Sequence, residues 1–176
     1  MGKKSTKENK NVYQLSREKM GFTREKASEA LNCISSDRIE KIESEKSLPH
    51  PDEILAMAEC YKIPNLCNYY CSHECPIGQR YVPEVVLDDL SKIVLQMLAS
   101  LNSLNKKKDR LIEITSNGKI DDDELYDFVM IQDELEKVSI TTEALQLWFE
   151  TTIANNQIDK EKLERVRKAI QSSTHK

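Results

Sequence analysis

Hydrophobic residues in the first third of the chain recur at helical spacing in short blocks, and turn-forming residues separate one block from the next. Gly21 ends the first block, and Thr23 is a candidate N-cap for the second. Short helices with brief connections indicate an all-α domain. We predict five helices here: residues 12–19, residues 24–31, a third from Ser35 or Ser36 that contains Ile39 and Ile42, a fourth capped by Asp52, and a fifth from Asn65.

After Pro83 the apolar residues repeat over much longer segments than before. Between residues 87 and 111 they are alternately three and four positions apart, which is the heptad pattern of a coiled-coil seam, with Lys108 as one polar exception. An Asn-Gly pair at 117–118 breaks this helix, and a run of Asp residues then favours the start of a second long helix. We therefore predict a long helical hairpin or coiled coil, followed by a last helix over residues 159–171.

Composition supports the all-α fold and divides the chain by charge. Only four of the 176 residues are Gly and 32% are charged, as is typical of amphipathic helices. Residues 1–50 contain eleven Lys or Arg against eight Asp or Glu, whereas residues 51–176 contain fifteen against twenty-two. A basic first segment suits contact with a polyanion, and the lysines at positions 3, 4, 7 and 10 form either an arm that follows phosphates or a solvated terminus.

Neither a membrane span nor a signal peptide is expected from the sequence. No run approaches the roughly 18 consecutive apolar residues that a transmembrane helix needs, and the N-terminus has no apolar stretch. We expect a cytoplasmic protein with no membrane partner. Because cytoplasmic thiols stay reduced, the five cysteines point to metal binding rather than to disulfides.

Two predicted helices on either side of a short turn are the pattern of a helix-turn-helix. The segment TREKASEALNCISSDRIEKIE, from Thr23 to Glu43, resembles the helix-turn-helix of the Cro/C1-type (xenobiotic-response-element) regulators, and the similarity continues through SLPHPDEILAMAECYKIP. It covers residues 12–66. The resemblance implies a five-helix DNA-binding domain whose third helix enters the major groove, while the N-terminus of the second helix contacts phosphates.

The resemblance, together with the nearby charges, defines a candidate set of DNA contacts. The sequence departs from the family pattern where Asn32 and Glu45 replace usual Gly residues, and where the turn is one residue longer at Cys33-Ile34. Acidic residues near the third helix also oppose DNA, so a scaffold for protein contacts is the alternative use of this fold. The candidate contact residues are Arg24, Ser35, Ser36, Asp37, Arg38, Lys41 and Lys46.

Four cysteines lie close together and are the strongest chemical signal in the sequence. Cys67, Cys71 and Cys75 form a C-x3-C-x3-C motif, and Cys60 precedes them. Four thiolates bind either tetrahedral Zn or an iron–sulfur cluster. On a helix, sulfurs four residues apart start about 6 Å apart along the axis, which is wide for Zn and favours a [4Fe-4S] cluster. Burial as small hydrophobic side chains, or a reversible dithiol, is the alternative.

A second resemblance spans nearly the whole chain. The segments LCNYYCSHECPIG and NGKIDDDELYDFVMIQDELEKVSITTEALQLWFE resemble a group of helix-turn-helix regulators found in anaerobic Gram-positive bacteria, with a four-Cys motif and a helical C-terminal region. This similarity implies an oxygen-poor cytoplasm, in which an exposed cluster survives. It implies no particular ligand or target.

We therefore predict a DNA-binding transcriptional regulator with a helix-turn-helix domain at 1–66, a Cys-rich neck and linker at 67–83, and a helical dimerisation region at 84–176. Its expected partners are double-stranded DNA and a second copy of the chain, and its four-Cys site is expected to sense redox state or metal. The alternative is an adaptor that binds proteins and whose cysteines hold structural Zn or no ligand. No phosphate loop, nucleophile elbow or paired His base occurs, so we expect neither an enzyme nor a small-molecule substrate.

Overall fold

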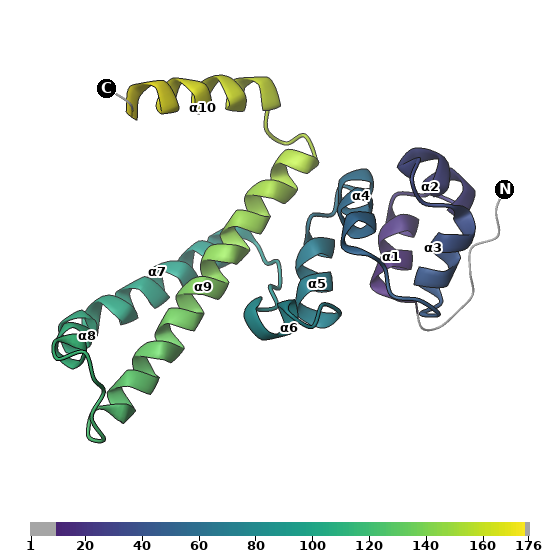
Figure 1. Ribbon diagram of the computed structural model, residues 1–176. Helices are drawn as coiled ribbons and strands as arrows, with labels where there is room; N and C mark the ends of the chain where they lie inside the picture. Colours follow the sequence, from purple (N-terminus) through teal and green to yellow (C-terminus); the bar gives the residue numbers. More distant parts are fainter. Residues whose placement is uncertain (1–9, 175–176) are drawn as a thin grey trace. The chain divides into compact units, whose positions relative to one another are not determined.

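The computed structural model describes residues 10–174, which form ten helices and no strand (Figure 1). The prediction of an all-α fold is confirmed. Within the described part, one compact unit contains the chain up to Glu84 and the segment from Glu150 onward, and a second unit contains Val85–Phe149. The lysines at positions 3, 4 and 7 of the candidate phosphate arm lie outside the described residues.

The first unit begins with five short helices joined by brief connections. They are α1 (Val12–Lys19), α2 (Arg24–Leu31), α3 (Ser36–Glu43), α4 (Pro51–Tyr61) and α5 (Asn65–His73). The predicted bounds of the first two helices and the predicted start of the fifth agree with these. A single-turn helix, α6 (Gly78–Tyr81), follows where the sequence predicted only a linker.

Local capping explains where these helices start. The side chains of Asn11, Thr23 and Ser35 each accept a hydrogen bond from the backbone N–H three residues on, at 3.0–3.2 Å. The fourth helix differs from the prediction, because its N-cap is His50 and Asp52 lies within its first turn. The acidic side chain of Asp52 still favours this end of the helix through the macrodipole.

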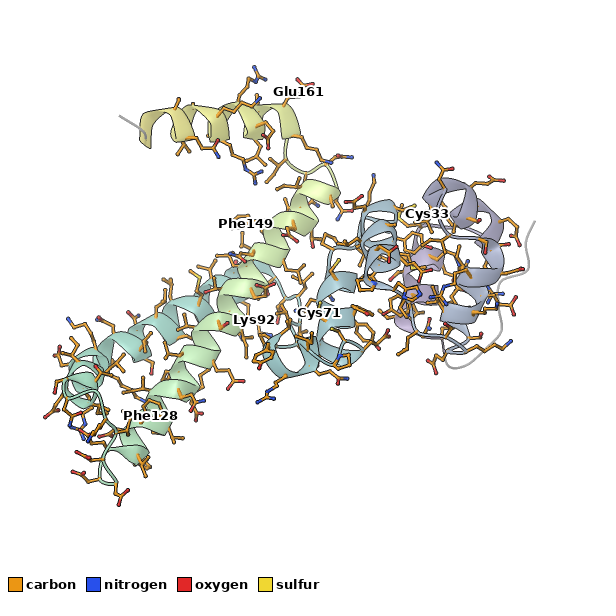
Figure 2. The ribbon with its side chains drawn as sticks, viewed as in Figure 1. Cys33, Cys71, Lys92, Phe128, Phe149 and Glu161 are labelled. Carbon is orange, nitrogen blue, oxygen red and sulfur yellow. The ribbon has the colours of Figure 1, made fainter. Side chains whose placement is uncertain are left out.

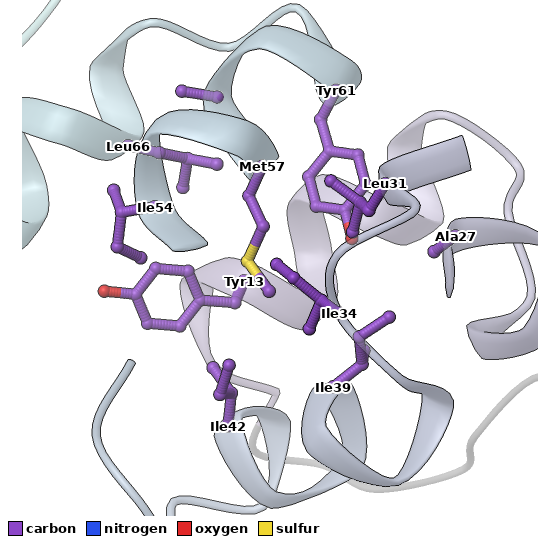
Figure 3. Close-up of a cluster of buried hydrophobic side chains, with 11 residues drawn as sticks. Tyr13, Ala27, Leu31, Ile34, Ile39, Ile42, Ile54, Met57, Tyr61 and Leu66 are labelled. Atoms are coloured by element: carbon purple, nitrogen blue, oxygen red, sulfur yellow. The ribbon is translucent and has the colours of Figure 1, made fainter. Parts of the chain in front are cut away.

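Eleven buried side chains from α1 to α5 and their connections form one hydrophobic core (Figure 3). Ala27 and Ile39 are fully buried and bring α2 against α3. Ile34 lies in the connection between these two helices and is also buried. Each large aliphatic side chain in such a core contributes about 1.5–3 kcal/mol relative to exposure, so the five helices depend on one another.

The second unit is a helical hairpin. It contains α7 (Leu90–Lys106), α8 (Lys108–Thr115) and most of α9 (Leu125–Ala154), and α10 (Lys160–Thr174) follows in the chain. The first long helix of the prediction is interrupted at Lys107, which separates α7 from α8. The Lys107 side chain donates to the carbonyl of Met130 at 3.3 Å and lies 3.8 Å from the Glu134 carboxylate. Both partners belong to α9, so the residue that interrupts the helix contacts the opposite arm of the hairpin.

The core of this hairpin is thin. Ile93 packs with Val85, Ala144 and Leu147, whereas Leu101, a member of the predicted heptad seam, is 41% exposed. Ile93, the buried position of α7, therefore lies beside the seam predicted for residues 87–111. The use of that seam in a coiled coil stays a prediction. Across residues 10–174, none of the helices combines the length and the apolar character needed to cross a membrane.

Candidate nucleic-acid interface

α3 faces the core on one side and solvent on the other. Ile39 and Ile42 are buried in the shared core, whereas Asp37, Glu40 and Lys41 are exposed. The separation follows from helical spacing, because residues three and four positions apart lie on the same face. A helix anchored along one side in this manner leaves the opposite side accessible to a groove of DNA.

The connection between α2 and α3 runs from Asn32 to Ser35. Asn32 adopts a left-handed conformation with φ of 56°, and Glu45, which follows α3, has φ of 60°. A left-handed backbone is the conformation that Gly adopts most readily, so both residues take a conformation usual for Gly. Cys33, in this connection, is exposed (Figure 2), whereas the next residue, Ile34, is buried.

Glu43, the last residue of α3, joins three helices through buried hydrogen bonds. Its side chain is 1% exposed and accepts from Arg17 of α1, with Nε at 2.5 Å and Nη2 at 2.9 Å. Arg24 of α2 donates to the same carboxylate from Nε at 2.8 Å. Arg17 also donates from Nη1 to the carbonyl of Phe22 at 2.6 Å. A buried pair of this kind stabilises only when both partners are present, so Glu43 fixes the C-terminal end of α3.

Arg38 lies on α3, but its guanidinium is bound within the protein. Nε and Nη2 donate to the two carboxylate oxygens of Glu53 on α4, both at 2.7 Å. Nη1 donates to Ser47 Oγ at 2.6 Å, and Nη2 donates to the carbonyl of Leu48 at 2.9 Å. Glu53 also accepts the backbone N–H of His50 at 2.7 Å. The hydrogen bond from Arg38 holds the pKa of Glu53 below its usual range, and this geometry favours a structural role for Arg38 over a DNA contact.

The other predicted cations lie around the exposed face of α3. Lys41 is exposed on the helix itself. Lys46 follows the helix, with its Nζ 4.0 Å from the Glu40 carboxylate. Arg24 keeps about a third of its side chain exposed, and its Nη1 lies 3.9 Å from the same carboxylate. Glu40 thus stands between two of the three cations and reduces the positive potential there.

The N-terminal end of α3 contains the three remaining predicted residues. Ser35 is the N-cap, and its Oγ accepts the backbone N–H of Arg38 at 3.2 Å. Ser36 is half-buried at the first helical position, and Asp37 follows it in an exposed position. Backbone N–H groups at this end of a helix favour a phosphate, whereas the carboxylate of Asp37 opposes one.

The four cysteines of the predicted metal centre lie on two helices and in the segment that follows the second. Cys60 lies in α4, Cys67 and Cys71 lie in α5, and Cys75 follows the end of α5. All four are half-buried free thiols. Among the described residues, no three Cys, His, Asp or Glu side chains come close enough together to hold a metal ion. The four-thiolate centre, with a [4Fe-4S] cluster or Zn, therefore stays a prediction from the sequence and does not enter the proposed function.

The cysteines instead pack as small apolar side chains. Cys60 and Cys67 contact the hydrophobic core of the first unit. Burial raises the pKa of the Cys60, Cys67 and Cys71 thiols, which keeps them protonated and weakly reactive. This arrangement favours the alternative in which the cysteines hold no ligand.

Cys71 also lies where α6 packs against α5 (Figure 2). A Cβ atom placed on Gly78 would meet the carbonyl oxygen of Cys71 at 2.0 Å. The backbone N–H of Gly78 donates to Cys75 Sγ at 3.5 Å. The close contact of α6 with α5 therefore requires Gly at position 78.

Sequence reasoning missed the residues that hold α3 in place. Glu43 pairs with Arg17 across 26 positions of the chain, and Glu53 pairs with Arg38 across 15. No local spacing identifies partners so far apart. The one available signal is that Glu43 directly follows the buried Ile42, where an unpaired carboxylate would be costly.

The chain matches no protein-family model, no curated protein and no solved structure. The functional interpretation therefore depends on the placement of α3 and on the side chains around it.

Proposed function

We propose that the first unit binds double-stranded DNA through the exposed face of α3. The observation that carries this proposal is the anchoring of α3 at two places on its inner side, by Glu43 to α1 and α2 and by Arg38 to α4. Fixed positions on a rigid helix orient the outer side chains for base edges. This outer face is formed by Asp37, Glu40 and Lys41.

Affinity in this proposal comes from a small set of cations. Lys41 and Lys46 neutralise phosphates, and Arg24 adds a contact beside the start of α2. Arg38 takes no part, because its donors are directed to Glu53, Ser47 and Leu48. With so few phosphate contacts, binding should be moderate at low salt and should weaken steeply as salt is raised.

Base preference comes from the acidic residues of the same face. A carboxylate in the major groove accepts a hydrogen bond from the amino group of cytosine. Asp37 lies in the first turn of α3, the part of a recognition helix that contacts base edges. We therefore expect selected binding sites to contain a cytosine opposite Asp37.

Fluorescence anisotropy with random-sequence duplexes tests the proposal. Lys41→Glu should weaken binding at least about tenfold, and Lys41→Ala should reduce the slope of log Kd against log salt by about one. Lys106→Glu is the matched control, because it makes the same charge change at an exposed position of α7. Equal affinity of the Lys41 and Lys106 variants would contradict the proposal.

A second candidate function is an adaptor that binds a basic protein segment. The observation that favours it is the acidic character of the outer face, where Asp37 and Glu40 outnumber Lys41 once Arg38 is neutralised by Glu53. An adaptor would show no duplex binding even at low salt. In that case Asp37→Lys should abolish capture of a basic peptide, whereas Lys41→Glu should strengthen it.

The metal centre stays a prediction from the sequence. UV-visible spectra and metal analysis of protein purified without oxygen test it directly. A coloured, iron-containing protein would require α5 to rearrange so that the four thiols converge.

A further inference from the structure

α10 is a basic amphipathic helix with an exposed apolar stripe. Its 15 residues contain five Lys or Arg and two Glu. Val166 and Ile170 are 56% and 60% exposed, and helical spacing places them on one side of the helix. By the same spacing, Lys162 borders this stripe on one side and Arg167 borders it on the other. Arg167 lies 3.2 Å from Glu164 of the same helix, an exposed pair that contributes little.

α9 has the opposite charge and an exposed apolar stripe of its own. It contains six Asp or Glu and a single Lys. Leu125 and Val129 are 48% and 51% exposed and lie four positions apart on one side of the helix, whereas the buried Ile131 lies on the opposite side. Figure 2 labels Phe128, which precedes Val129, toward the N-terminal end of the helix. Helical spacing places the exposed Asp133 and Glu136 along the stripe.

We propose that α10 of one chain packs on the exposed stripe of α9 in a second copy of the chain, and that the exchange is reciprocal. Val166 and Ile170 would cover Leu125 and Val129, which removes apolar area from water on both helices. The charges that border the two stripes are complementary, which favours this register over α9 with α9 or α10 with α10. A symmetric pair of this kind uses the same two surfaces in both chains.

The length of α10 favours a second copy over the same chain. The N–H groups of Asn155, Asn156 and Gln157 donate to the last turn of α9, and Asp159 accepts the N–H of Lys162 at 3.1 Å as the cap of α10. Little extended chain therefore remains between the two helices. A helix rises about 1.5 Å per residue, so α10 folded back along its own α9 would end near residue 140, short of the stripe at Leu125 and Val129.

An anionic membrane is the other surface that a basic amphipathic helix fits. It would account for α10 alone, whereas association of two chains accounts for the exposed stripes of both α10 and α9. The acidic residues along α9 have no counterpart in membrane binding. These charges make the second copy the better partner.

Sedimentation velocity of the full chain with paired charge reversals tests the proposal. One variant combines Lys162→Glu with Arg167→Glu, and the other combines Asp133→Lys with Glu136→Lys. The wild type should sediment as twice the chain mass of 20.3 kDa, and each variant alone should associate at least about tenfold more weakly. An equimolar mixture of the two variants should restore the dimer, because each α10 then meets an α9 of opposite charge.

Three results would overturn the proposal. They are a monomeric wild type at high micromolar concentration, a dimer that both reversals leave intact, and a mixture of variants that stays monomeric. Binding of the wild type to phosphatidylserine vesicles that only the α10 reversal abolishes would assign α10 to a membrane instead. Sedimentation measures association without DNA, so the result is independent of the proposed nucleic-acid function.

Discussion

The two compact units bury their hydrophobic residues in different ways. In the first, side chains from five helices meet in one core, and Glu43 and Arg38 add hydrogen bonds between helices. In the second, a thin line of residues lies between two helices, and large apolar side chains such as Leu95 remain 67% exposed. The first unit thus has the features of a self-sufficient fold, whereas the second has surface that a partner would cover.

The largest effect should come from the buried ion pair of the first unit. Glu43→Gln leaves the buried charge of Arg17 with only the longer contact to Glu18, at 4.0 Å, which should lower the free energy of unfolding by about 3–5 kcal/mol. Urea unfolding followed by near-UV circular dichroism of the tyrosines measures this. Fluorescence of Trp148, the single Trp, follows the second unit separately.

The matched control for this variant is Glu40→Gln. Glu40 lies on the same helix, but its side chain is 51% exposed, so its loss should change stability by less than about 0.5 kcal/mol. Equal effects of the two variants would show that Glu43 is not a junction of three helices.

Truncation of one apolar side chain in each unit tests how differently the two units bury their hydrophobic residues. Ile39→Ala should cost about 2–5 kcal/mol, because it opens a cavity in a packed core. Leu95→Ala should stay within about 0.5 kcal/mol in the monomer, because that side chain is already in solvent. Thermal unfolding of both variants measures the difference, and a cost for Leu95→Ala near that of Ile39→Ala would mean that Leu95 is covered in the folded protein.

Gly78→Ala should cost about 2–3 kcal/mol, since a methyl group would overlap the backbone of Cys71 and displace α6. Gly118→Ala is the control, because its φ of +72° is unfavourable for Ala but no atom lies within 4 Å of the added Cβ. That control should cost about 1 kcal/mol. Hydrogen exchange of α5 and α6 would locate the effect, and unchanged protection in Gly78→Ala would refute the close contact.

A smaller effect, of opposite sign, is expected at Glu45. Its φ of 60° is left-handed, so Glu45→Gly should raise stability by about 0.5–1 kcal/mol. Glu59→Gly, in the last turn of α4, makes the same chemical change where the backbone is helical and should lower stability by about 1 kcal/mol. Urea midpoints compare them, and a loss of stability in Glu45→Gly would contradict the left-handed conformation.

The smallest effect concerns pH at the edge of the first core. Burial raises the pKa of Glu74 above its usual 4.5, so the folded state holds this proton more tightly than the unfolded state. The stability from that proton is present below pH 4.5 and is lost as pH rises through the folded-state value. Glu74→Gln should therefore flatten the decline in stability above pH 4.5, whereas Glu59→Gln at an exposed position should leave it unchanged. Parallel slopes for all three proteins would refute the burial effect.

The sequence could predict features that depend on neighbouring residues. Helix starts at Thr23 and Asn65 follow from local capping and from proline, and the all-α class follows from composition and spacing. The sequence could not predict the break at Lys107, because that residue bonds to α9 more than twenty positions away. The pairing of Arg38 with Glu53 was missed for the same reason, so a residue expected to contact DNA proved to hold two helices together.

The cysteine motif shows why spacing alone does not fix the positions of side chains. Intervals of four residues place Cys67, Cys71 and Cys75 on one face only if the helix continues through all three. α5 ends at His73, so Cys75 lies beyond it, and Cys60 packs against the core from another helix. Helix ends are set by packing as well as by local sequence, and the thiol positions depend on them.

Because α3 has inner positions that hold the fold and outer positions that face solvent, its outer side chains can be exchanged without loss of the fold. Arg38, Ile39, Ile42 and Glu43 hold the scaffold, whereas positions 37, 40 and 41 do not contribute to the core. A library randomised at the three outer positions should keep its melting temperature while its ligand preference varies. The first unit would then serve as a frame for selecting binders to new targets.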